Sequence, residues 1–195
     1  GFIEGDMAEI WSEAEGCLKK AHELNDNDFE VHRLMAEVNL SGRNFRVAER
    51  HASKAFKMVP NDPRVLSVYG EVSLRLGKID QGLDALKLAL EIDPIAQGKT
   101  NSDSRTSPVL FGEYLARNKD NCLELVEKLE DIDSKSWLLT AKLCSDEEHD
   151  ITEEDWYKRG KEEFKDKDWS TEVDSFRLNN EGAKESLIEF AESLY

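Results

Sequence analysis

Apolar residues along the chain recur with the spacing of amphipathic α-helices. In the segment "VHRLMAEVNL", Leu34, Met35 and Val38 fall on one helical stripe, and "RVAERHASKAFKMVP" continues the same periodicity. Glycine and polar residues interrupt the pattern at 41–44 and again at 77–79. The pattern therefore predicts antiparallel helix hairpins with turns at these two places, and negligible β-strand.

The helical pattern repeats along the chain with a constant step. Pro60 and Pro94 lie 34 residues apart, and each ends an apolar helical stretch, because proline cannot donate the backbone hydrogen bond that continuation needs. The same step relates residues of similar size: Ala36 to Gly70, Phe45 to Ile79, Ala48 to Gly82, Ala55 to Ala89 and Met58 to Ile92. One step back from Phe45, Ala48 and Ala55 are Trp11, Ala14 and Ala21. The small residues mark places where two helices must approach closely, and a two-helix period of this length is typical of tetratricopeptide arrays.

The stretch "VLSVYGEVSLRLGKIDQGLDALKLALEIDP" (65–94) resembles the tetratricopeptide repeat family. The family's two glycines, its second-helix alanine and its terminal proline correspond to Gly70, Gly77, Ala89 and Pro94. The family's tyrosine is replaced by Asn39 and Ser73, and Gly82 stands where alanine is usual. The resemblance covers about 8–94. It implies an all-α fold, an α-solenoid of antiparallel helix hairpins (a TPR-like superhelix) with a C-terminal capping helix.

The sequence predicts three segments. Residues 1–94 are tetratricopeptide repeats with the first one truncated, 95–108 are a polar loop, and 109–195 are degenerate helical repeats ending in the capping helix. In the last segment, Trp156, Gly160 and Trp169 stand at positions that the family fills with similar residues, and Thr152 with Asp155 form a possible capping pair. The capping helix would bury one face, made of Ala183, Leu187, Phe190, Ala191 and Leu194.

The tripeptide Gly98-Lys99-Thr100 has the ending of a phosphate-binding loop. Such a loop also needs a preceding strand and a glycine five residues before Gly98, where this chain has Asp93. The tripeptide is therefore interpreted as loop sequence that follows the end of a repeat.

No other pattern indicates catalysis or a metal site. The histidines His22, His32, His51 and His149 are scattered, and His32 occupies the family's usual tryptophan position, which favours a packing role over that of a base. The acidic stretch "DEEHDITEED" reads as a solvated linker, and the three cysteines form no metal-binding spacing. Cys17 and Cys122 are predicted to be small buried residues. We therefore expect no metal, no cofactor and no enzyme activity.

The formal net charge of −16 disfavours nucleic acid and anionic membranes as partners. No apolar run approaches the roughly 20 residues that span a bilayer. Cysteines that remain free thiols fit a reducing compartment, which predicts a cytoplasmic location. The chain does not start with methionine, and we interpret it as part of a longer protein.

The resemblance implies a protein-interaction module whose concave face, lined by the first helix of each repeat, takes a peptide or a partner helix. By position in the repeat, that face would contain Glu30, Arg33, Glu37, Ser41, Arg64, Ser67, Glu71 and Arg75. The alternating charges favour a polar ligand of mixed charge, although an ordinary solvated helix face would show them too. The double charge reversal Arg33→Glu with Arg64→Glu is expected to abolish partner capture and to leave melting nearly unchanged.

Two further hypotheses concern the context of the repeats. The segment from "EVHRLMAEV" to "VPNDP" is similar to the accessory tetratricopeptide region of bacterial class III cyclases and winged-helix regulators, which implies a regulatory or oligomerisation role. The chain begins within a repeat, so the apolar edge made by Trp11, Ala14 and Leu18 would pair weakly with a second copy.

Overall fold

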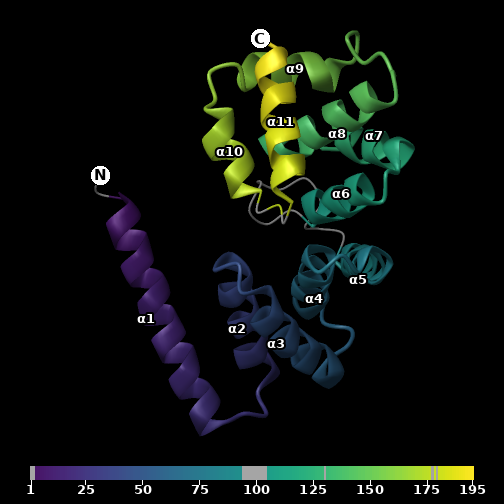
Figure 1. Ribbon diagram of the computed structural model, residues 1–195. Helices are drawn as coiled ribbons and strands as arrows, with labels where there is room; N and C mark the ends of the chain where they lie inside the picture. Colours follow the sequence, from purple (N-terminus) through teal and green to yellow (C-terminus); the bar gives the residue numbers. More distant parts are fainter. Residues whose placement is uncertain (1–2, 94–104, 130, 177, 179) are drawn as a thin grey trace. The chain divides into compact units, whose positions relative to one another are not determined.

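The computed structural model describes residues 3–93, 105–129, 131–176, 178 and 180–195, and in these residues it contains helices and no strand. The helices are α1 (Ile3–Leu24), α2 (Phe29–Ser41), α3 (Phe45–Met58), α4 (Pro63–Arg75), α5 (Ile79–Ile92), α6 (Thr106–Leu115), α7 (Lys119–Glu127), α8 (Ser134–Asp146), α9 (Asp155–Glu163), α10 (Trp169–Ser175) and α11 (Glu181–Ser193) (Figure 1). The all-α class is therefore confirmed. Backbone contacts divide the chain into two compact units, unit 1 (Gly1–Ile92) and unit 2 (Asp93–Tyr195).

Unit 1 contains two helix hairpins of the same dimensions. Helices α2 and α3 form the first hairpin, and α4 and α5 form the second. Helix α4 begins and ends 34 residues after α2 does, and α5 begins and ends 34 residues after α3 does. This is the step that separates Pro60 from Pro94. The turns lie between 41 and 45 and between 75 and 79, as the sequence predicts.

The first helix of each hairpin begins at an aspartate. The carboxylate of Asp28 accepts hydrogen bonds from the backbone N–H groups of Glu30 and Val31, at 2.9 and 3.4 Å. Asp62, one repeat later, accepts the equivalent bonds at the same two distances. These side chains satisfy backbone donors that have no partner within the helix, so they define where each hairpin starts.

Each of these first helices ends in a left-handed turn residue. Arg43 has φ 60° and Gly77 has φ 75°, one repeat apart. The following backbone N–H, of Asn44 or Lys78, donates to a carbonyl five residues earlier, at 2.8 and 2.9 Å. This arrangement ends a helix and reverses the chain. Glycine adopts the left-handed conformation without steric cost, whereas the first hairpin accepts an arginine there.

Small residues set the distance between the two helices of each hairpin. In the first hairpin, Ala36 and Ala48 are completely buried. In the second, the equivalent residues are Gly70 and Gly82, and a Cβ atom on either would lie 2.9 Å from the carbonyl oxygen of the other. Glycine at position 82 therefore lets α4 and α5 lie closer together than an alanine there would allow, because the Cβ atom of alanine would not fit without moving the backbone.

Ala48→Leu or Ala89→Leu is expected to lower the free energy of unfolding by about 1–3 kcal/mol, since both alanines are completely buried at close helix contacts. Urea unfolding followed by circular dichroism measures the change. Ala183→Leu is the matched control, because Ala183 is exposed and the same substitution there should change stability by less than about 0.5 kcal/mol. Equal midpoints for all the variants would show that the two alanines are not close contacts.

Unit 2 also begins with a hairpin, made by α6 and α7, and α8 packs against both helices. Its core surrounds Trp137 of α8, which is completely buried. The ring of Trp137 lies 5.7 to 6.0 Å from the rings of Tyr157, Phe164 and Trp169, and its Nε1–H donates to the carbonyl of Tyr157 at 3.2 Å. Gly160 touches the same indole, where a Cβ atom would lie 2.3 Å from Cδ1. Gly160 and Trp169, two of the residues noted in the sequence, thus belong to one packed cluster around Trp137.

The start of α6 differs from the prediction. Helical structure begins at Thr106 rather than at Val109, so the last three residues of the predicted loop 95–108 belong to the helix. Pro108 is the third residue of α6, where the backbone N–H has no acceptor within the helix, so proline is tolerated. The rest of that loop, including Gly98-Lys99-Thr100, lies outside the described residues except for Arg105.

Three smaller predictions are wrong. Cys17 is exposed, because α1 is covered along a narrow face through Ala14, Leu18 and His22 and Cys17 lies beside that face. Ala183 of α11 is exposed, because the helix packs on α8 and α10 through Leu187 and Ala191 further along. Thr152 does not cap α9. The Thr152 hydroxyl donates to Asp150, and the N-cap of α9 is Glu154, which makes no side-chain cap bond.

Candidate partner-binding face

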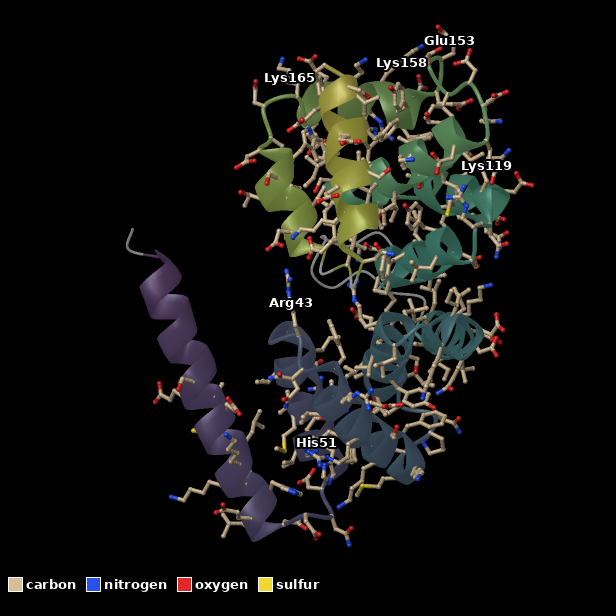
Figure 2. The ribbon with its side chains drawn as sticks, in the orientation of Figure 1. Arg43, His51, Lys119, Glu153, Lys158 and Lys165 are labelled. Carbon is tan, nitrogen blue, oxygen red and sulfur yellow. The ribbon has the colours of Figure 1, made fainter. Side chains whose placement is uncertain are left out.

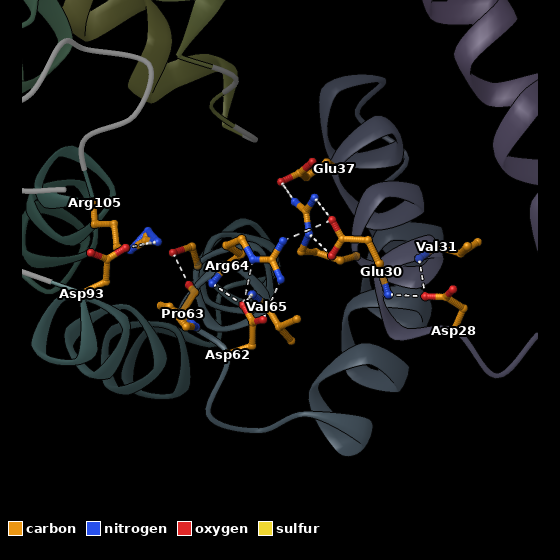
Figure 3. Close-up of polar contacts among 12 residues, drawn as sticks. Asp28, Glu30, Val31, Glu37, Asp62, Pro63, Arg64, Val65, Asp93 and Arg105 are labelled. Atoms are coloured by element: carbon orange, nitrogen blue, oxygen red, sulfur yellow. Dashed lines mark hydrogen bonds and ion pairs between the residues drawn. The ribbon is translucent and has the colours of Figure 1, made fainter. Parts of the chain in front are cut away.

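Helices α2 and α4, the first helices of the two hairpins, lie side by side in unit 1. The guanidinium of Arg64 on α4 reaches the carboxylate of Glu30 on α2, with Nη1 3.4 Å from Oε1 (Figure 3). The eight residues predicted for the partner face occupy equivalent positions in these helices, as the pairs Glu30 and Arg64, Arg33 and Ser67, Glu37 and Glu71, and Ser41 and Arg75. The structure thus places them on adjacent helices.

Arg33 is held between two carboxylates of its own helix. It donates from Nε and Nη2 to Glu30, at 3.0 and 2.7 Å, and from Nη1 to Glu37. The hydrogen bond from Arg33 lowers the pKa of Glu30, and the same bond raises the pKa of Arg33. The side chain of Arg33 is only 11% exposed. Its main role is therefore internal, and a glutamate there would place three carboxylates together, so the Arg33→Glu and Arg64→Glu double variant would lose stability.

Arg64 is the more accessible arginine. Its side chain is 51% exposed, and it pairs with Asp62, with Nη2 2.8 Å from Oδ2 and Nε 3.2 Å from Oδ1. The hydrogen bond from Arg64 lowers the pKa of Asp62. A pair of this exposure contributes little to stability, so Arg64 can exchange its partner for a ligand at low cost.

Glu37 and Glu71 bring two carboxylates to the middle of the row. Burial raises the pKa of Glu37, and the nearby charges of Glu71 and Glu30 raise it further, although Arg33 opposes them. Glu37 is 41% exposed, and Glu71 is half-buried. Among the described residues Glu71 has no ion-pair partner. Negative potential therefore remains in this part of the row.

The remaining predicted residues offer less to a ligand. The hydroxyl of Ser67 donates to the carbonyl of Pro63 at 2.8 Å, so its proton is already used. Arg75 is buried, with 8% exposed, and Ser41 is half-buried. Of the charged side chains in the row, Arg64 at 51% and Glu37 at 41% are more exposed than Glu30 at 35% and Arg33 at 11%, and half-buried Glu71 has no described ion-pair partner.

Sequence reasoning missed two features of this face. The caps Asp28 and Asp62 recur with the repeat step, and that recurrence was visible in the sequence. Glu30, Arg33 and Glu37 are spaced three and four residues apart, which is the spacing at which side chains of one helix form ion pairs. That spacing was a signal that Arg33 would be occupied from within its own helix.

The histidines are not all scattered in space. His22, His32 and His51 meet at one point of unit 1, whereas His149 is exposed in unit 2. His32 is buried, with 2% exposed, in keeping with a packing residue. In the described part of the chain, no group of three or more histidine, cysteine, aspartate or glutamate side chains has a geometry that could hold a metal ion.

Unit 2 carries an apolar depression of about 300 Å³ between α8, α9 and α11. Ala141, Ile151, Tyr157, Phe190 and Leu194 form its apolar part. Glu148, His149 and Asp150 stand on its polar side. Its residues lie far from the predicted face in sequence, and no described contact identifies an occupant.

Comparisons with known proteins give limited similarity. No family model matches the chain. Cellulose synthase operon protein C of Pseudomonas fluorescens (strain SBW25) is 27% identical over 111 residues, which cover 53% of this chain and 9% of that protein. A solved structure titled as a functional characterization of Pseudomonas aeruginosa PilF is 16% identical, covers 82% of this chain and 85% of its own, and superimposes with a TM-score of 0.41. The chain thus spans about a tenth of the first protein's length, and the second similarity is too low to carry an argument.

The geometry of unit 1 itself shows that it contains two equivalent repeats. Its two hairpins share all four helix bounds at the repeat step, with caps, turn residues and small contact residues in equivalent places. Residues 29–92 form two helix-hairpin repeats that resemble tetratricopeptide repeats. In these repeats α2 and α4 are the first helices, and the row from Glu30 to Arg75 lies along them.

Within the described residues, no helix of this chain is long and apolar enough to cross a membrane.

Proposed function

We propose that the chain is a protein-interaction module that binds a peptide or a helix of a partner protein on the face formed by α2 and α4. The observation that supports this proposal most directly is that α2 and α4 lie side by side and are joined by the Glu30–Arg64 ion pair. Charged groups on such a face give specificity and steer association more than they add affinity. The proposed module is not an enzyme and needs no cofactor.

Charge composition narrows the class of partner. The net charge of −16 works against nucleic acid and anionic membrane surfaces, so a protein partner is favoured. We place the module in the cytoplasm, since free thiols such as exposed Cys17 persist in a reducing compartment. In a longer protein it would serve as an accessory region, for which a regulatory or oligomerisation role beside a cyclase-type domain is the alternative.

Self-association is a second proposal for the edge formed by α1. Leu24 is 81% exposed at the end of this helix, and Ala14 and Leu18 are only half-buried. The side chain of Trp11, which the sequence places on the same edge, lies outside the described part of the chain. A second copy would cover this edge, but the acidic chain repels itself, so the contact would be weak and strengthened by salt.

The test uses the double variant Arg64→Glu with Glu71→Lys, which changes the row and conserves net charge. We expect it to lose capture of proteins from a lysate of the source cell, with at least a tenfold weaker affinity for the partner identified by mass spectrometry. Thermal melting should fall only slightly. Arg64→Glu adds a carboxylate beside Asp62 and Glu30, but the side chain is half-exposed, so solvent screens the repulsion, and Glu71 has no described ion-pair partner.

The matched control is Lys57→Glu with Asp84→Lys. Both residues are exposed on the second helices, α3 and α5, and this exchange also conserves net charge. The control should capture the partner as the parent does. If the Arg64→Glu, Glu71→Lys variant captured the partner as well as the parent does, the α2–α4 face would not be the binding surface. The depression of unit 2 would then be the next candidate.

A further inference from the structure

Three histidines from three consecutive helices meet in unit 1. His22 of α1, His32 of α2 and His51 of α3 have ring centroids 5.0, 5.1 and 5.8 Å apart (His51 is labelled in Figure 2). The Nδ1 atoms of His32 and His51 are 2.8 Å apart, and the Nε2 atom of His32 is 2.9 Å from the carbonyl oxygen of Asp26. We call these three residues the histidine cluster.

The hydrogen bonds assign the protons of two rings. The carbonyl of Asp26 can only accept, so Nε2 of His32 carries a proton and donates it. In neutral His32 the Nδ1 atom is then the acceptor, and Nδ1–H of His51 is the donor. A second proton on His32 would go to Nδ1, and His51 would then have to carry its own proton on Nε2 in order to accept that bond. If both rings were charged, two N–H groups would face each other at 2.8 Å, so this pair of nitrogens tolerates one added proton at most.

The charges around the cluster do not favour protonation. The α1–α2 turn contributes Asp26, whose side chain is 74% exposed, and α3 contributes Lys54 and Arg50. Lys54 also donates to the carbonyl of Asp26 at 2.6 Å. Burial lowers the pKa of His32, and burial together with His32 lowers the pKa of His51 to about 4. Nδ1 of His22 is buried without a hydrogen-bond partner in the described structure.

Over the part of α1 whose side chains the structure describes, residues 12–24, the helix contacts the rest of unit 1 through little apolar surface. Over the described side chains 12–24, none is fully buried, and those that turn inward are half-buried: Ala14, Glu15, Leu18, Ala21 and His22. The neighbour of α1 in the structure is α2, and the contact to α3 runs through His22 and His51. The histidine cluster thus lies at the place where α1 is held.

We propose that the histidine cluster makes the attachment of α1 sensitive to acid, so that mild acidification releases α1 from α2 and α3 while the two repeats stay folded. Release removes the ring of His22 from beside His32 and His51 and exposes these two rings to water, which relieves the burial that disfavours their charged forms. The released helix uncovers the edge of the first repeat, which then becomes available to another surface.

The direction and range of the effect follow from the lowered pKa values. A histidine whose pKa is lower in the folded state contributes stability fully above its ordinary pKa of about 6.5, and that contribution is lost as the pH falls toward the folded value. For His51 the range is about pH 6.5 to about 4. Since His51 stays beside His32 after release, its own contribution at pH 5 is at most about a thirtyfold shift toward release, the value for a ring that regains the ordinary pKa in full.

Cys17 allows a direct test in the full chain. It is the exposed cysteine on α1, whereas Cys122 and Cys144 are buried, so a spin label attaches there selectively. A second label is placed on α3 by Lys57→Cys, and the distance distribution between the labels is measured from pH 7.5 to 4.5 in the presence of EDTA. We expect a narrow distribution at pH 7.5 that becomes broad below pH 6, while circular dichroism shows that the other helices persist.

Variants decide whether the cluster is responsible. His51→Gln, and separately His32→Gln with His51→Gln, should remove most of the pH dependence, and His149→Gln should leave it unchanged because His149 is exposed in unit 2. The single variant keeps the test valid if the double variant does not fold. A distribution that stays narrow to pH 4.5, release at the same pH in the cluster variants, or release that occurs only without EDTA would each overturn the proposal.

Discussion

Trp137→Ala is expected to lower the free energy of unfolding of unit 2 by about 3–5 kcal/mol. Trp137 is completely buried, contacts three aromatic rings and donates a hydrogen bond to the carbonyl of Tyr157. Alanine removes the indole, leaves a large cavity between α8, α9 and α10, and leaves that carbonyl without its donor. A protein with ordinary stability would lose a large fraction of it.

Urea unfolding followed by circular dichroism at 222 nm measures this effect without relying on tryptophan emission, which the substitution itself changes. Leu24→Ala is the control for removing a large apolar side chain, because Leu24 is 81% exposed and its loss should change stability by less than about 0.5 kcal/mol. A loss below about 1 kcal/mol for Trp137→Ala would mean that the cluster of unit 2 is not packed as described.

Gly70→Val is the corresponding test of overpacking in unit 1, with an expected loss of about 3 kcal/mol. A Cβ atom at this position would lie 2.6 Å from Cγ of Leu86 and 2.9 Å from the carbonyl oxygen of Gly82. A leucine side chain can rotate away, but the Gly82 carbonyl belongs to the backbone of α5. The two helices of the second repeat must therefore separate, which exposes the contacts of Leu66 and Ala89.

Gly16→Ala is the matched control for the loss of a helical glycine. A Cβ atom on Gly16 would meet nothing within 4 Å, and alanine is the better helix former by about 1 kcal/mol. Gly16→Ala should thus leave stability equal or slightly higher in the same urea experiment. Equal midpoints for Gly70→Val and the parent would contradict the close approach of α4 and α5.

The repeat architecture of unit 1 could be predicted because its signals are local and recur. Helix periodicity, the prolines at the ends of second helices and the small residues at 36, 48, 70 and 82 all carry the same repeat step. Unit 2 was harder to predict, since its hairpin and its aromatic cluster do not keep that step. There Trp137, Gly160 and Trp169 come together from three helices of unequal length.

The position of the candidate face could be predicted from the sequence, but the pairing and exposure of its charged side chains could not. The repeat step places Glu30 beside Arg64 once the first helices are known to be neighbours. Which charges remain accessible depends on burial and side-chain pairing. Arg33 is nearly buried between two carboxylates, Arg75 is buried, and Arg64 is half-exposed in its ion pairs, and a repeat pattern does not encode these differences. Position follows from the backbone repeat, whereas accessibility follows from the neighbours of each side chain.

The sequence by itself determined the helical class, the hairpins of residues 29–92 and the small residues between their helices, because each depends on interactions within or between adjacent helices. Only the tertiary structure decided that Cys17 is exposed and that His22, His32 and His51 form a cluster. These three histidines stand on different helices, at unequal intervals along the chain that share no periodicity. Their meeting is a consequence of how α1, α2 and α3 pack, and packing depends on the whole surface of each helix rather than on any local pattern.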